Sequence, residues 1–180
     1  MPAPRVLSHD WIGDDDLGRM RTLGKMRNLV RWGSRNRHVR RLVPTVCGVE
    51  PTRSVGVLEH RARQIRAWCE RSIDFENDPP GIELLYQPEY LARLALAGIR
   101  IRCDCDDVAT FSGAIAYSVG LSVQFRAVSF LDKRAPFAHV FTELGVPAHL
   151  GGGGPVVDVD ITRAQQGLPP CISREMVIKV

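Results

Sequence analysis

The order of helical and alternating segments along the chain predicts an α+β protein. In the first part of the 180-residue sequence, apolar residues recur at helical spacing, whereas after Gly120 they recur at every second position. Helices followed by a run of antiparallel-type strands are typical of the α+β class. With 44% hydrophobic and 24% charged residues, the composition is that of a globular protein and excludes a disordered or fibrous one.

Three helical segments are expected in the first half of the chain. A basic amphipathic helix, or a pair of short helices broken at Gly33-Ser34, is predicted over 17–41. Pro44 and Pro51 then bracket a short linker, because proline disfavours a helix interior. Further helices are predicted over 52–72 and 88–97 from the spacing of their apolar residues.

A further helix is predicted to begin directly after Asp104. Asp104 is a good N-cap residue, and Asp107, at the third helical position, is expected to complete an acidic version of the capping box. The buried side of this helix is predicted from apolar residues at helical spacing, which are Val108, Phe111, Ile115 and Val119.

Four strands are predicted after Gly120. The first is the alternating stretch 123–128, and the next two are expected over 138–144 and 155–161, joined by a loop that holds Gly151 to Gly154. The segment 174–180 is predicted as the last strand. Together they predict an antiparallel sheet with the helices packed on it.

The positive charge of the chain is concentrated near its start. The formal net charge is +4, and the segment between Leu17 and Val49 holds basic residues and no acidic one. A nucleic-acid partner would use such a block, but Trp32 is the only aromatic residue in it for base stacking. We therefore predict a solvated helix face and no nucleic-acid partner, and divide the chain into a tail and basic helical leader, 1–45, and a core, 46–180.

The distribution of apolar residues and cysteines predicts a cytoplasmic protein. No apolar run is long enough to cross a membrane, and the first residues carry no signal-peptide pattern. The five cysteines are odd in number and unevenly spaced, which disfavours both a disulfide framework and a structural zinc site. No cofactor is expected.

Cys105 is the strongest candidate nucleophile. At the first position of a helix, the backbone N–H groups and the positive end of the helix dipole stabilise a thiolate and an oxyanion formed on an attacked acyl group. The neighbouring acids Asp104, Asp106 and Asp107 oppose the thiolate, so a basic partner is required. These acids are not expected to converge at a helix start, so no metal site is predicted.

His139 is the histidine whose context best suits that partner. By the period of two, His139, Phe141 and Glu143 share one face of a predicted strand. The following strand carries Asp158 and Asp160 in phase with each other, and either carboxylate could orient the imidazole. Gln87 is a weaker candidate, as a side-chain donor to an oxyanion.

These motifs resemble the transglutaminase-like superfamily in its compact bacterial and phage form. The resemblance covers about residues 53–180 and keeps the order and approximate spacing of the family. The basic leader also looks like that of the phage-type members. The matching segments are Asp78-Pro79-Pro80-Gly81-Ile82-Glu83, Asp104-Cys105-Asp106-Asp107, His139-Val140-Phe141-Thr142-Glu143 and Asp158-Val159-Asp160-Ile161-Thr162.

The resemblance implies a papain-like fold and a cysteine-dependent acyl transfer on amide bonds. It implies Cys105 as nucleophile, His139 as general base and acid, and Asp158 or Asp160 as the orienting carboxylate, with the Asp-x-Thr match favouring Asp160. Peptidase or amidase chemistry on a protein or peptide substrate is expected ahead of transglutaminase-type cross-linking. The alternative is a catalytically silent phage or prophage protein that keeps the fold and binds other phage proteins during assembly.

Overall fold

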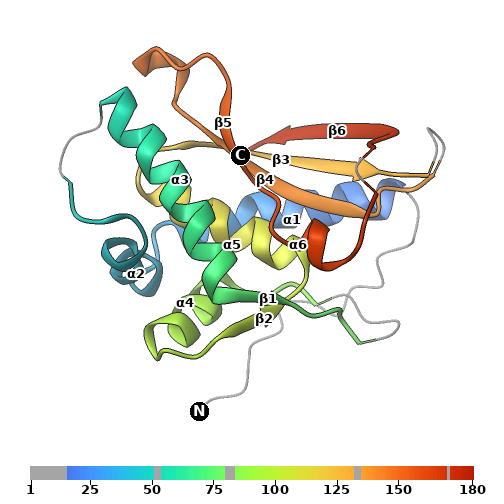
Figure 1. Ribbon diagram of the computed structural model, residues 1–180, viewed down its shortest axis with the longest axis horizontal. Coiled ribbons are helices and arrows are strands. Elements are labelled where there is room, and N and C mark those ends of the chain that lie inside the picture. Colours follow the sequence, from blue (N-terminus) through green and yellow to red (C-terminus); the bar gives the residue numbers. More distant parts are fainter. Residues whose placement is uncertain (1–15, 51–53, 80–83, 132–134, 170) are drawn as a thin grey trace.

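The computed structural model describes residues 16–50, 54–79, 84–131, 135–169 and 171–180 (Figure 1). Its helices are α1 (Asp16–Gly33), α2 (Arg37–Cys47), α3 (Val55–Ser72), α4 (Pro88–Leu96), α5 (Cys105–Ser118) and α6 (Thr162–Gln165), with a 3-10 turn at Ala148–Leu150. Its strands are β1 (Ile73–Phe75), β2 (Ile101–Cys103), β3 (Ser122–Ser129), β4 (His139–Gly145), β5 (Pro155–Val159) and β6 (Arg174–Lys179).

The larger sheet is antiparallel and follows the four strands predicted after Gly120. Its strand order is β5-β4-β3-β6, with Phe125 opposite Thr142 and Val128 opposite His139 in the central pair. A second, two-stranded sheet joins β1 and β2 in parallel. The helical first part and the antiparallel sheet confirm the α+β class.

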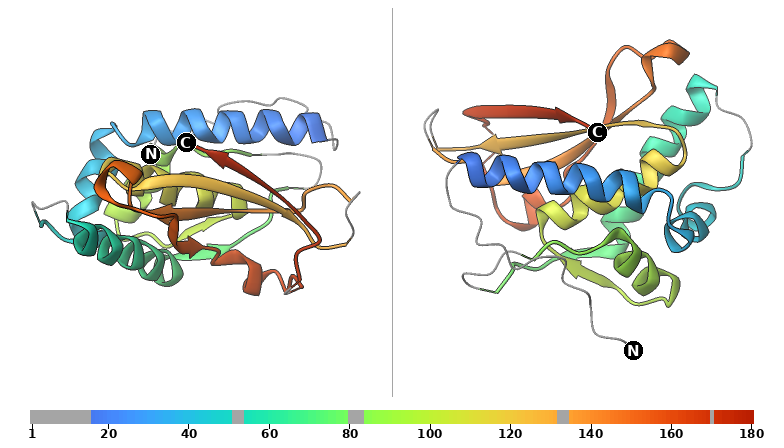
Figure 2. Two further views of the ribbon diagram at one scale, coloured as in Figure 1. Left: turned by 90° about the horizontal axis from the view of Figure 1, so that it is seen from above. Right: turned by 180° about the vertical axis from the view of Figure 1, so that it is seen from behind.

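Helix α5 lies in the middle of the molecule, against the large sheet and with α1 and α3 on opposite sides of it (Figures 1 and 2). Its first eleven residues after Cys105 are all buried. One side, with Phe111 and Ile115, packs in a cluster with α2, α3, α4 and the two short strands. The opposite side, at Ala109, packs with α1 and with Phe125 of β3. Every side of α5 therefore meets protein, which explains why apolar and small residues dominate its sequence after Asp107.

The helices of the predicted leader contribute to the core. Met26 and Val30 of α1 are fully buried against α5 and β3. Val39 and Leu42 of α2 are equally buried in the cluster that contains α3 and α4. The polar side of the same helices faces solvent, and none of the nine basic residues between Leu17 and Val49 is buried. No helix in the described part of the chain has the length and apolar character to cross a membrane.

The structure differs from the prediction at Pro44 and at the short strands. Pro44 lies inside α2, which continues to Cys47, so the linker predicted to start at Pro44 is wrong. Burial of Val46 and Cys47 offsets the missing backbone hydrogen bond. Pro51, the other end of that linker, lies outside the described residues. Strands β1 and β2 were not predicted, because three residues are too few for an alternating pattern.

Candidate active site

Cys105 is held at a strand-to-helix junction. Cys103 ends β2 in the parallel pair with β1, and two residues later α5 begins at Cys105. Asp104 has extended backbone angles, and its carboxylate accepts a hydrogen bond of 3.4 Å from the Asp107 N–H, which confirms the predicted N-cap. Cys105 is half-buried. The first turn of α5 supplies the N–H groups and the positive dipole end that stabilise an anion.

The carboxylate of Asp107 makes a hydrogen bond that the sequence did not predict. It is fully buried and accepts a hydrogen bond of 2.6 Å from the backbone N–H of Tyr86, in the segment that leads into α4. The capping box prediction expected this carboxylate to reach back to the start of its own helix. Its bond to Tyr86 joins the first turn of α5 to the α4 region instead.

His139 and Asp160 form a buried hydrogen-bonded pair. The imidazole Nε2 lies 2.6 Å from Oδ1 of Asp160, and the side chains are 0% and 9% exposed. Asp160 directly follows β5, which ends at Val159 and not at residue 161 as predicted. If the neutral imidazole carries its proton on Nε2 and donates a hydrogen bond to the Asp160 carboxylate, Nδ1 is the ring nitrogen that can accept a proton. Nδ1 is buried and has no hydrogen-bond partner among the described residues.

Asp158 and Gln87 lie apart from this pair. Asp158 is exposed and forms an ion pair with Arg66 of α3, so of the two candidate acids it is Asp160 that bonds to His139. Gln87 caps the start of α4 without a side-chain hydrogen bond. It lines a separate pocket of about 380 Å³ that also includes Trp32. The structure therefore does not bring Gln87 into the pocket of the predicted nucleophile.

Cys105 and His139 line one pocket of about 310 Å³. Helix α1 forms one wall, and the starts of α5 and β4 form others. Asn77 and Gln166 also line it. The described residues that line it are Arg19, Thr22, Leu23, Met26, Phe75, Asn77, Asp104, Cys105, Asp106, Ala127, Phe137, Ala138, His139, Val140 and Gln166.

Aromatic rings and a guanidinium group cover the His139–Asp160 pair. The rings of Phe130 and Phe141 lie 6.2 and 6.0 Å from the imidazole, centroid to centroid. The Arg163 guanidinium lies over Phe130 at 5.0 Å and 3.8 Å from the Asp160 carboxylate. The Thr142 hydroxyl donates a hydrogen bond to the backbone carbonyl of Ala109, so Thr142 lies on the face of β4 that meets α5. Because side chains alternate along a strand, His139 lies on the opposite face of β4. No hydrogen bond joins Cys105 to the described Nδ1 of His139.

The other cysteines differ from Cys105 in environment. None of the five, all of which are described, forms a disulfide. Burial raises the pKa of the Cys47 and Cys103 thiols and raises that of Cys69 to about 12. Cys171 is exposed. Cys105 and Cys171 are therefore the two thiols that dissolved reagents can reach.

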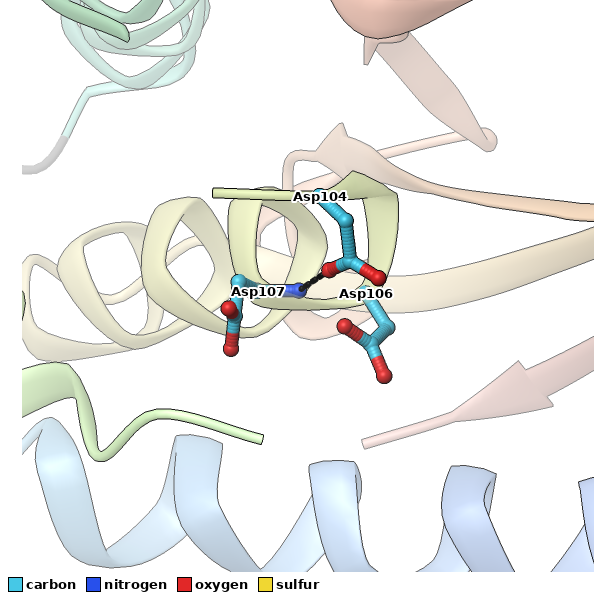
Figure 3. A group of neighbouring side chains, drawn as sticks. All are labelled: Asp104, Asp106 and Asp107. Carbon is cyan, nitrogen blue, oxygen red and sulfur yellow. Dashed lines mark hydrogen bonds between the residues drawn. The ribbon is translucent and has the colours of Figure 1, made fainter. Parts of the chain in front are cut away.

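The three acids around Cys105 converge, contrary to the prediction. One carboxylate oxygen from each of Asp104, Asp106 and Asp107 lies within 4.8 Å of the other two. Figure 3 shows the Asp106 and Asp107 side chains on the same side of α5, toward α1. The local geometry could hold a hard cation. The prediction failed because it assumed that successive residues of a first turn diverge, whereas Asp104 folds back over the helix start.

Several residues of the site carry no signal in the sequence. Arg19, Phe130, Arg163 and Gln166 come from three separate segments, and only the tertiary fold brings them to the pocket or to the His139–Asp160 pair. Asn77 directly precedes the Asp78-Pro79-Pro80-Gly81 segment of the resemblance but was not expected at the site. Comparisons with protein-family models, with curated proteins and with solved structures found no match to this chain.

Proposed function

We propose that the protein is a cysteine-dependent acyl transferase that acts on amide bonds, with Cys105 as nucleophile, His139 as proton carrier and Asp160 as the orienting carboxylate. One observation carries the proposal. A buried imidazole is held at Nε2 by Asp160 and keeps Nδ1 without a described partner, and His139 is one of the residues that line the pocket of Cys105, a half-buried thiol at a helix start. The helix-on-sheet arrangement is compatible with a papain-like core, which the resemblance to the transglutaminase-like superfamily implies.

The reaction follows from these positions. His139 accepts the thiol proton at Nδ1, and the sulfur attacks the amide carbon to form a C–S bond. When the tetrahedral intermediate collapses, the C–N bond breaks and His139 returns the proton to the leaving amine. Water then adds to the thioester, the C–S bond breaks, and a carboxylic acid and the thiol are released. An amine in place of water would give transamidation, and we propose hydrolysis of a protein or peptide as the main outcome.

The oxyanion of the intermediate requires donors near the sulfur. The Cys105 backbone N–H lies at the positive end of α5. Asn77 and Gln166 are among the residues that line the pocket, and their side-chain amides replace Gln87 as candidates for the second donor. The thiol and Nδ1 must approach when substrate binds, since such bonds often tighten only in the complex.

A second function is favoured by the enclosure of His139. Its side chain is 0% exposed, lies beside the rings of Phe130 and Phe141, and has no hydrogen-bond partner at Nδ1 among the described residues. In a catalytically silent protein that binds a partner, for example during phage assembly, the pair with Asp160 would be a core contact. The reactivity of Cys105 separates the two functions.

Alkylation kinetics test the proposed function. Iodoacetamide would be reacted with the wild type, His139→Ala and Asp160→Asn over a range of pH, and each cysteine would be followed by peptide mass spectrometry. We expect Cys105 to react in the wild type well below the pH of an ordinary thiol, about 8.5, and its profile to move upward in both variants. Cys171, which is exposed, serves as the internal reference. If the alkylation rate of Cys105 depends on pH as that of Cys171 does, and neither substitution changes it, the result would favour the binding protein.

A further inference from the structure

Asp106 is a buried carboxylate that the mechanism does not use. The residue is 3% exposed, and in the ionised form neither carboxylate oxygen has a hydrogen-bond partner among the described residues. A proton on one oxygen would point to the neighbouring carboxylate of Asp104. Buried polar groups are nearly always paired, so a carboxylate without a donor calls for a missing partner.

Asp106 belongs to the wall of the pocket that contains Cys105. Its side chain projects from α5 toward α1 (Figure 3). A group bound at Asp106 would therefore lie one residue away from the proposed nucleophile.

The remaining walls of the pocket suit an aliphatic chain. Leu23 and Met26 of α1 line it together with Phe137 and Val140 of the β4 region. Two acidic residues, Asp104 and Asp106, line the pocket where α5 begins. Among the described lining residues, Arg19 is the only lysine or arginine. The pocket thus combines an apolar passage with the carboxyl groups of two residues, against one guanidinium group, beside Cys105.

We propose that this pocket binds a cationic side chain of the acyl substrate, an alkyl ammonium or guanidinium group, with Asp106 as the residue that recognises the cation. The aliphatic stem lies along Leu23 and Met26, and the cation donates its N–H groups to the Asp106 carboxylate. The assignment rests on the acyl-transfer function proposed above, because the carbonyl of the same substrate must reach Cys105. It makes the substrate a basic peptide.

Thiol reagents of different charge test this site. Three methanethiosulfonates react with a cysteine thiolate by the same displacement, in which a mixed disulfide with a small thioalkyl group forms and methanesulfinate leaves. They carry an aminoethyl cation, a neutral methyl group or a sulfonatoethyl anion. Their rates would be measured at Cys105 and at the exposed Cys171 of the same molecules, with a chelator present to exclude metal ions. We expect the ratio of cationic to neutral rate to be about tenfold higher at Cys105 than at Cys171, equivalent to about 1.4 kcal/mol.

Three variants assign the preference to Asp106. Asp106→Asn keeps the shape of the side chain and should bring the Cys105 ratio down to that of Cys171. Arg19→Gln removes the lining cation and should raise the ratio. Asp158→Asn is the matched control, because it makes the same chemical change at an exposed residue outside the pocket, and it should leave the ratio unchanged.

The outcomes separate this inference from the proposed function. A Cys105 that reacts readily with the neutral reagent but shows no preference for the cation, or keeps its preference in Asp106→Asn, overturns the cation site and leaves the nucleophile intact. A preference for the anionic reagent that appears only without the chelator would assign the carboxylates to a metal ion and overturn the inference as well. A Cys105 as slow as a buried thiol with all three reagents overturns the proposed function itself, and with it the site.

Discussion

At the scale of single residues, Asp106 couples the pocket to the stability of the fold. Burial, and after it the Asp104 carboxylate, raises the pKa of Asp106 well above its usual range. A carboxyl group whose pKa is raised by folding binds its proton more tightly in the folded chain. Its contribution to stability is complete below the unfolded value, about 3.9, and is lost as the pH rises toward the folded value.

Asp106→Asn should therefore stabilise the protein, and more so at higher pH. The amide cannot ionise, so we expect the free energy of unfolding to rise by about 1–3 kcal/mol near pH 8, with a smaller gain near pH 5. Urea denaturation of both proteins at the two pH values measures this. Asp158→Asn, an exposed ion-pair partner, should change stability by less than about 1 kcal/mol at either pH. A variant that is less stable than wild type at both would show that the carboxylate is a structural contact.

The residues of the site differ in how far the sequence could predict them. Cys105 and its cap Asp104 are local features of one helix start, and the sequence predicted their relation correctly. The choice between Asp158 and Asp160 depends on where β5 ends and on Arg66, which is far away in the chain. Phe130 and Arg163 could not be predicted, because their contacts with His139 and Asp160 arise only from the tertiary fold.

At the scale of elements, glycine sets how closely α1 approaches its neighbours. A Cβ at Gly33, the last residue of α1, would lie 2.7 Å from Pro88 Cβ of α4 and 3.2 Å from Ala114 Cβ of α5. A Cβ at Gly24, in the interior of the same helix, would meet nothing within 4 Å. Close packing therefore requires glycine at position 33, whereas the space around position 24 allows a larger side chain.

Alanine at the two positions should shift stability in opposite directions. Gly33→Ala forces α1 and α4 apart, and we expect a loss of about 1–3 kcal/mol. Gly24→Ala adds helix propensity without a clash and should gain up to about 1 kcal/mol. Thermal or urea unfolding of the pair measures both effects under the same conditions. Equal effects of the two substitutions would contradict the packing of α1 against α4 and α5.

The long elements were predictable from periodicity and the short ones were not. The break between α1 and α2, the start of α5 and the four strands after Gly120 each follow from several residues in one pattern. Pro44 shows the limit, because a local rule predicted the end of a helix that burial of Val46 and Cys47 continues. Strand β2 ends at the buried Cys103 and consists of only three residues, yet it delivers the chain to Cys105.

At the scale of the whole molecule, the pocket is assembled from both ends of the chain. Helix α1 supplies Arg19, Leu23 and Met26, whereas Gln166 comes from the segment that follows α6. The sequence predicted α1 as part of a leader and gave no sign that it lines a pocket beside Cys105. Amphipathicity shows that a helix buries one face but not which partner covers that face.

The central claim is that Cys105 forms an acyl-enzyme with the help of His139 and Asp160. The most direct measurement is to mix the protein with an activated acyl ester, quench in acid and locate the acyl group by peptide mass spectrometry. The wild type should carry a thioester on Cys105 that forms much faster than any on Cys171 and is lost by hydrolysis, whereas His139→Ala should acylate slowly at Cys105. Acylation of Cys171 alone would contradict the account, and so would a Cys105 thioester that forms at the same rate in His139→Ala as in the wild type.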